Sequence, residues 1–127
     1  MSKTVIATTN APEAAGPYSQ ATRANGFIFV SGQLPLHPET GEMPDTVAEQ
    51  TALCLGNIEA ILASEGGGMG DIVKCMVFLT DMDQFGEMNA VYAGAFETAP
   101  PARSAYQVVR LPKDAKVEIE AIAVANS

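Results

Sequence analysis

The segment from Lys116 to Val124 limits the possible folds more than any other part of the sequence. Its residues alternate at the period of a β-strand, in which successive side chains point to opposite faces of a sheet. One face is wholly apolar and suits a core beneath helices: Val117, Ile119, Ala121 and Ala123. The other mixes carboxylates with apolar groups: Glu118, Glu120, Ile122 and Val124. Because a two-layer domain would leave those apolar groups in water, we expect a partner subunit to cover them, with the glutamates near a cleft or rim.

The first half of the chain predicts a hairpin, a loop and a helix. Strands are expected over residues 18–23 and 27–31, joined by the favoured turn Asn25-Gly26. Prolines and a glycine make residues 34–44 a loop. Residues 46–65 then predict a helix, in which Asp45 or Thr46 is the cap and Glu49 completes a capping box. Three consecutive glycines, Gly66–Gly68, end it.

The second half predicts a buried strand and a shorter helix. Residues 72–80 are apolar on both alternating faces, with Ile72, Met76 and Phe78 on one and Val73, Cys75, Val77 and Leu79 on the other. Residues 84–97 form the helix, for which Asp83 is the expected cap. Its buried stripe is Phe85, Met88, Tyr92, Ala95 and Phe96. Asn89 falls on the same stripe, so its amide must find a partner.

Two more strands, over residues 103–109 and 116–124, follow the helix-breaking pair Pro100-Pro101. The order is β-β-α-β-α-β-β, which predicts an α+β fold with one sheet and both helices on one face. No repeat or linker divides residues 1–127, so we expect a single domain.

Composition and charge exclude several classes of function. Apolar residues make up 47% of the chain and charged residues 17%, which is typical of a globular domain. The net charge of −8 disfavours binding to nucleic acid or to an anionic membrane surface. With His37 as the single histidine and no C-x-x-C pair, we expect no metal site. Residues 1–10 lack a secretory h-region, and two isolated thiols favour a cytoplasmic location.

Arg103 is the strongest candidate for a binding residue. It opens a strand after Pro-Pro-Ala, where a guanidinium could capture a carboxylate by two parallel hydrogen bonds. The structural alternative is a salt bridge to Glu118 or Glu120. Glu120 in turn could act as a general acid or base, or only as that ion-pair partner.

Tyr18 and Asn89 are weaker candidates, each with a structural alternative. Tyr18 could bond a ligand or pack on the core at the start of a strand. Asn89 could touch a ligand or hold a nearby loop.

Several ordered motifs resemble one family, the Rid family (also called YjgF-type), and within it the RidA enamine/imine deaminases. The resemblance covers nearly the whole chain. It rests on Ala15–Ala21 (AGPYSQA), Val30–Gln33 (VSGQ), Asn89–Tyr92 (NAVY), Pro101–Ser104 (PARS) and Leu111–Ala123 (LPKDAKVEIEAIA).

The resemblance implies a chorismate-mutase-like fold assembled as a homotrimer, with the sheets forming an inner barrel and a site in each cleft between subunits. It further implies cofactor-free hydrolysis of reactive 2-imino acids, formed from 2-aminoacrylate or 2-aminocrotonate, to 2-keto acids and ammonia. By position, Arg103 matches the carboxylate-binding arginine and Glu120 the glutamate that orients or activates water. Tyr18, Ser31, Gly32 and Asn89 match residues that line the cleft, and Ala105 matches a position that contacts ligand through its backbone.

One departure concerns position 105, where many RidA members have cysteine and this chain has Ala105 followed by Tyr106. Backbone contacts survive that change, but any role of the thiol is lost. Two other functions stay open: a ribonuclease or translation inhibitor, as attributed to some relatives, and a non-catalytic trimer that binds small acids or acts like a chaperone. The single histidine and the acidic charge disfavour RNA cleavage.

Overall fold

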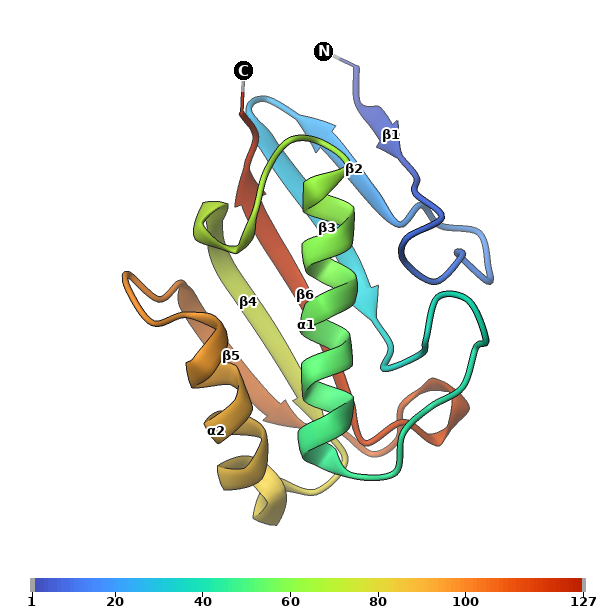
Figure 1. The fold of residues 1–127 in the computed structure, drawn as a ribbon, viewed down its shortest axis with the longest axis vertical. Coiled ribbons are helices and arrows are strands. Elements are labelled where there is room, and N and C mark those ends of the chain that lie inside the picture. Colours follow the sequence, from blue (N-terminus) through green and yellow to red (C-terminus); the bar gives the residue numbers. More distant parts are fainter. Residues whose placement is uncertain (1, 127) are drawn as a thin grey trace.

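Within residues 2–126, which the computed structural model describes, six strands form one mixed sheet in the order β1-β2-β3-β6-β4-β5. Both α-helices lie on the same face of this sheet (Figure 1). The expected α+β arrangement is therefore confirmed. The elements are β1 (Thr4–Ile6), β2 (Ala21–Ala24), β3 (Phe27–Gln33), α1 (Val47–Ala63), β4 (Ile72–Leu79), α2 (Phe85–Ala95), β5 (Ala102–Gln107) and β6 (Val117–Val124).

β6 lies inside the sheet, antiparallel to both β3 and β4, while β5 pairs in parallel with β4 at the edge. The predicted alternation of β6 is confirmed. Its apolar set is fully buried under the helices, and the opposite set is partly or fully exposed. We call the side of the sheet without helices the open face. It carries a group of apolar side chains that are partly or well exposed: Phe27, Phe29, Met76, Phe78, Tyr106, Ile122 and Val124.

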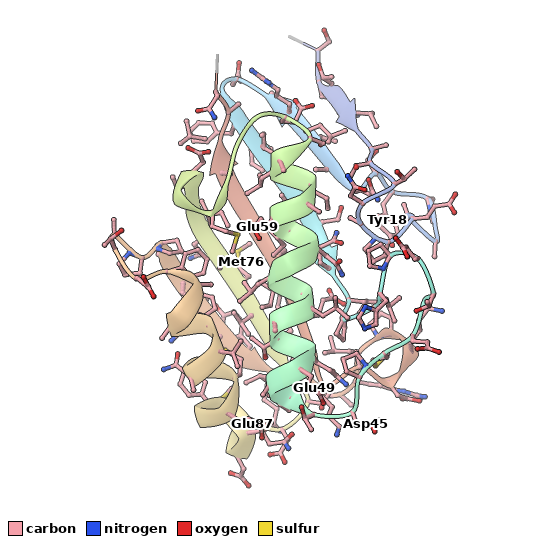
Figure 2. All side chains as sticks on the ribbon, viewed as in Figure 1. Tyr18, Asp45, Glu49, Glu59, Met76 and Glu87 are labelled. Carbon is pink, nitrogen blue, oxygen red and sulfur yellow. The ribbon has the colours of Figure 1, made fainter. Side chains whose placement is uncertain are left out.

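The start of α1 is fixed by side chains from two elements. Thr46 caps the helix, because its hydroxyl accepts a hydrogen bond from the Glu49 backbone N–H at 3.1 Å. Glu49 does not complete the predicted capping box; its carboxylate accepts from the Thr46 hydroxyl instead. The Glu87 carboxylate on α2 accepts a hydrogen bond from the Ala48 N–H at 2.9 Å, which links the two helices at this end. Figure 2 shows Glu49 and Glu87 near one another there.

The hairpin turn is confirmed, since Asn25 and Gly26 both adopt the positive φ angles of 52° and 81° that such a two-residue turn requires. The first strand was placed too early, because it begins at Ala21. Residues 16–20 form a turn instead, in which the Tyr18 N–H donates to the Gly16 carbonyl. Tyr18 is therefore a loop residue with half of its surface exposed, and the alternative in which it packs on the core is wrong.

Three further expectations need correction. The strand over residues 72–80 was expected to be covered on both faces, but only the face with Cys75, Val77 and Leu79 is buried. Val73 is exposed, because the register with β6 shifts between Ile72 and Lys74. Asp83 does not cap α2; a 3₁₀ turn precedes the helix, and Asp81 caps that turn by accepting from the Asp83 N–H. β1 was missed, since it is only three residues long.

Candidate functional site

Arg103 extends from β5 toward the helix side of the sheet. Its register partner on β4 is Cys75, which in turn pairs with Ala121 on β6, and both are buried beneath the helices. The side chain is half-buried and lies against one face of α2. A strand therefore supplies the cation, and α2, the helix that precedes this strand in the chain, supplies its surroundings.

Three residues of α2 surround the guanidinium. Asn89 Oδ1 accepts a hydrogen bond from Arg103 Nη1 at 2.6 Å. The ring centroids of Phe85 and Tyr92 lie 5.3 Å and 4.7 Å from the guanidinium carbon. Asn89 thus binds neither a loop nor a distant group, and the expectation that it holds a nearby loop is wrong.

Within residues 2–126 of one chain, the structural alternative for Arg103 is not found. Among the residues described, the two ion pairs are Arg23–Glu65 and Arg110–Asp114, and neither Glu118 nor Glu120 pairs with Arg103. A guanidinium carries five N–H donors, and this one uses one of them within residues 2–126. The other donors are available to an acidic ligand.

Glu120 lies on the opposite face from Arg103. It pairs with Met76 on β4, one position along from Cys75, so the pleat turns its side chain to the open face. A hollow of about 470 Å³ on this side is lined by Glu120 together with Tyr18 and Ser31. The predicted site residues therefore fall into two groups, one on each face of the sheet.

Backbone contacts hold the open-face group in place. Ser31 sits where the register of β3 with β6 is interrupted, between Val30 and Gln33. Its hydroxyl donates to the Ser19 carbonyl at 2.6 Å and its N–H to the Gln20 carbonyl at 2.9 Å. These bonds tie β3 to the loop that carries Tyr18, whose hydroxyl accepts from the Ala15 N–H at 3.3 Å.

The Glu118 carboxylate packs closely against Gly32. A Cβ atom at Gly32 would overlap it, so a larger residue there would have to displace the Glu118 side chain. Burial, followed by repulsion from Glu120, raises the pKa of the Glu118 carboxyl. Two carboxyl groups on one strand face, one of them biased toward its protonated form, can hold and pass a proton.

Ala105 lies on β5 two residues beyond Arg103 and on the same face, partly buried against the core. Because β5 is an edge strand, its outer backbone groups have no neighbouring strand within residues 2–126. The site residues that sequence reasoning missed are Phe85, Tyr92 and Glu118. The helical spacing of Phe85 and Tyr92 from Asn89 indicated a shared stripe, but it did not identify Arg103 as the group they contact.

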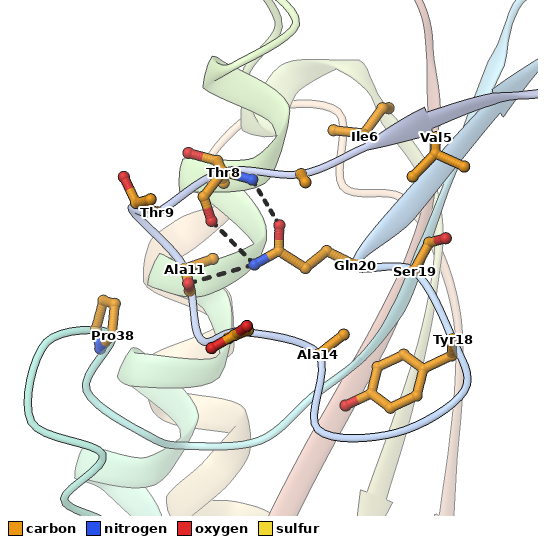
Figure 3. A pocket seen from close by; sticks show the side chains of 12 residues that line it. Val5, Ile6, Thr8, Thr9, Ala11, Ala14, Tyr18, Ser19, Gln20 and Pro38 are labelled. Carbon is orange, nitrogen blue, oxygen red and sulfur yellow. Dashed lines mark hydrogen bonds between the residues drawn. The ribbon is translucent and has the colours of Figure 1, made fainter.

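A larger hollow of about 670 Å³ lies beside the N-terminal segment (Figure 3). The Gln20 amide is buried there and fully engaged, since it bonds to Thr8, Ala11 and Pro12. Of the predicted site residues, only Tyr18 lines this hollow. With its buried amide occupied by the protein's own backbone, this hollow offers a ligand fewer polar partners than the Arg103 site.

Other features of the described residues bear on the excluded chemistries. His37 lies exposed in the loop between β3 and α1 and does not line the hollow that holds Glu120. Within residues 2–126 no group of three or more His, Cys, Asp or Glu side chains could hold a metal. No helix in that part of the chain has the length and apolar character to cross a membrane.

Comparison with known proteins links this arrangement to one family. Residues 8–125 match the family described as Endoribonuclease L-PSP. The chain is 50% identical over 127 residues to the 2-iminobutanoate/2-iminopropanoate deaminase of Escherichia coli, covering 98% of each chain. It is 50% identical over 122 residues to a RutC family protein of Pyrococcus horikoshii, covering 95% and 97%. The crystal structure of E. coli TdcF with bound serine superposes with a TM-score of 0.91 at 45% identity, covering 97% and 99%.

Proposed function

The chain belongs to the Endoribonuclease L-PSP family, which is the YjgF/Rid family, and on that basis we propose that it hydrolyses reactive 2-imino acids to 2-keto acids and ammonia. The observation that carries the proposal is the Arg103 guanidinium, which is held along one edge by Asn89 and has donors left for a carboxylate. A 2-imino acid presents such a carboxylate next to the carbon that reacts. The name of the E. coli relative, at 50% identity, supports this substrate class.

The reaction needs little machinery because the substrate is already activated. Arg103 binds the carboxylate and holds the C=N carbon beside Glu120 of a neighbouring copy of the chain. As the water oxygen bonds to that carbon, Glu120 takes a proton from the water, and the imine nitrogen takes one from the solvent as the C=N π bond breaks. The protonated Glu120 then gives its proton to the amino group of the resulting carbinolamine. The C–N bond breaks and releases ammonia, while the hydroxyl proton returns to the solvent and leaves the keto acid.

We further propose that the working form is a homotrimer whose sites lie between subunits. Two observations support an intersubunit site: Arg103 and Glu120 lie on opposite faces of one sheet, and the open face bears exposed apolar side chains beside Glu120. A neighbouring copy would cover that face and bring its own Arg103 to Glu120. We propose a cytoplasmic location, which the two free, buried cysteines favour.

A coupled assay tests the reaction. A serine or threonine dehydratase generates the imine, and semicarbazide traps whatever survives. We expect the wild-type protein to lower the amount of trapped product and Arg103→Ala to leave it unchanged. Arg110→Ala is the matched control, because Arg110 is an exposed arginine paired with Asp114. Equal trapping with wild type and with Arg103→Ala would contradict the proposed reaction.

The family description makes RNA cleavage the alternative activity. A purified protein that cleaves RNA in an Arg103-dependent manner, without consuming imine, would replace the proposal. Binding of a 2-keto acid without any turnover would favour the non-catalytic alternative, a small-acid binder.

A further inference from the structure

Helix α2 presents Phe85, Asn89 and Tyr92 toward Arg103. These residues are spaced by four and then three positions, which places them on one helical face. Among the described residues, Asn89 alone forms a hydrogen bond with the Arg103 side chain. The surroundings of this cation are therefore provided by one stripe of one helix.

The two aromatic rings and the amide constrain different motions of the guanidinium. Phe85 and Tyr92 attract its charge through their π faces, at 5.3 Å and 4.7 Å from the central carbon. Asn89 holds Nη1, which stops the group from rotating about its long axis. Within residues 2–126, the edge formed by Nε and Nη2 has no hydrogen-bond partner, and its parallel N–H groups match a carboxylate.

We propose that Phe85 and Tyr92 are positioning residues which, together with Asn89, hold Arg103 so that its Nε–Nη2 edge receives the substrate carboxylate. This inference rests on the proposed function and deepens it, since it assigns the orientation of the anion-binding group to α2. A long arginine side chain loses conformational entropy when it binds an anion, and a side chain already held in place loses less.

The Tyr92 hydroxyl identifies which part of that residue matters. It is buried beside the Cys75 thiol and, among the described residues, makes no well-formed hydrogen bond. A buried hydroxyl in this state costs stability, so it is not what the site gains from Tyr92. The ring that lies against Arg103 is the functional part.

The neighbouring thiol does not compete for the cation. Cys75 is buried behind Arg103 and Tyr92, and burial raises the pKa of its thiol. It therefore stays neutral near pH 7 and leaves the positive charge of Arg103 to the ligand.

The test measures binding of 2-oxobutanoate, a stable keto acid, by calorimetry and by the NMR signal of the Arg103 Nε–H. We expect Phe85→Leu and Tyr92→Leu each to raise the Kd by about 2- to 30-fold, the range that cation–π contacts span. Tyr92→Phe keeps the ring and should restore tight binding. Phe96→Leu is the matched control, because Phe96 packs on Tyr92 with centroids 4.8 Å apart and makes no cation–π contact with Arg103.

The outcomes separate this proposal from the proposed reaction. Binding that needs Arg103 but is unchanged in both leucine variants overturns the positioning role and leaves the reaction standing. Binding that weakens as expected in a protein without imine turnover supports the role and refutes the reaction. If Tyr92→Leu does not fold, the half-buried Phe85 still provides the test. Equal loss of binding in Phe96→Leu would mean that the helix core, not the contact with the cation, is responsible.

Discussion

The side chains of Arg103 and Glu120 leave one sheet on opposite faces, so within one chain the sheet stands between them. Arg103 lies on the helix side, where it donates a hydrogen bond to Asn89, and Glu120 borders a hollow on the open side. In the reaction proposed above, the two residues would act together where two copies of the chain meet.

This relationship predicts complementation between inactive variants. Arg103→Ala and Glu120→Gln should each be inactive alone. Unfolded together and refolded as a mixture, they should regain part of the imine turnover, because some interfaces combine an intact Arg103 with an intact Glu120. A mixture as inactive as its components, while exchange of subunits is verified by mass spectrometry, would contradict the intersubunit site.

Replacement of Asn89 by aspartate should separate stability from binding. The new carboxylate would accept from Arg103 Nη1 as Asn89 does, and would neutralise the guanidinium. We expect Asn89→Asp to weaken 2-oxobutanoate binding by at least about 10-fold, because a charge-assisted bond contributes roughly 1.5–3 kcal/mol. Thermal unfolding should show unchanged or higher stability. Wild-type affinity in this variant would show that the charge of Arg103 is not needed.

Gly32→Ala should displace the Glu118 side chain. The added methyl would overlap the Glu118 carboxylate, which is the flexible end of a partly exposed side chain and can move aside, so we expect a cost below the roughly 1–3 kcal/mol of overpacking in a rigid core. In a Glu118→Ala background the same change should cost less still, since the clashing atoms are gone. A double-mutant cycle on the free energy of unfolding measures this coupling. Equal costs in both backgrounds would mean that the backbone of Gly32, not the space beside it, is what matters.

Stability should decline with rising pH because of Glu118. Its pKa is raised in the folded chain above the ordinary value of 4.5. The folded state therefore holds the Glu118 proton more tightly than the unfolded state does. The contribution of Glu118 to stability is complete below the unfolded pKa of 4.5 and is lost as the pH rises through the higher folded pKa. Glu118→Gln should therefore stabilise the protein at pH 7.5 relative to wild type, by more than it does at about pH 4.

Urea unfolding at the two pH values checks this prediction. Glu59→Gln on the exposed side of α1 is the control, as it removes the same charge from solvent. A gain in stability for Glu118→Gln that is the same at both pH values would contradict the assignment.

Much of the fold could be predicted because local signals were strong. The alternation of residues 117–124 identified both faces of β6, and Asn25-Gly26 identified the hairpin. Errors occurred where tertiary contacts override local pattern. A register shift exposes Val73, and a turn closed by the Tyr18 N–H delays β2.

The site was harder to predict for a similar reason. Sequence reasoning singled out Arg103, Asn89 and Glu120 but could not tell which of them lie together. Contact between Arg103 and Asn89 depends on how α2 crosses β5, a property of packing. Glu118 on β6 likewise approaches Gly32 on the neighbouring strand β3, which is distant in sequence, so no local pattern reveals the contact.

The apolar open face would tie activity to protein concentration if copies of the chain assemble through it. If that face is where copies meet and where the site is completed, a chain diluted below the assembly constant has no site at all, however well it is folded. Specific activity would then fall steeply on dilution, and substitutions at Phe29 or Ile122 would inactivate without touching a reacting atom. Selection on catalysis would act on those side chains as strongly as on Arg103 itself.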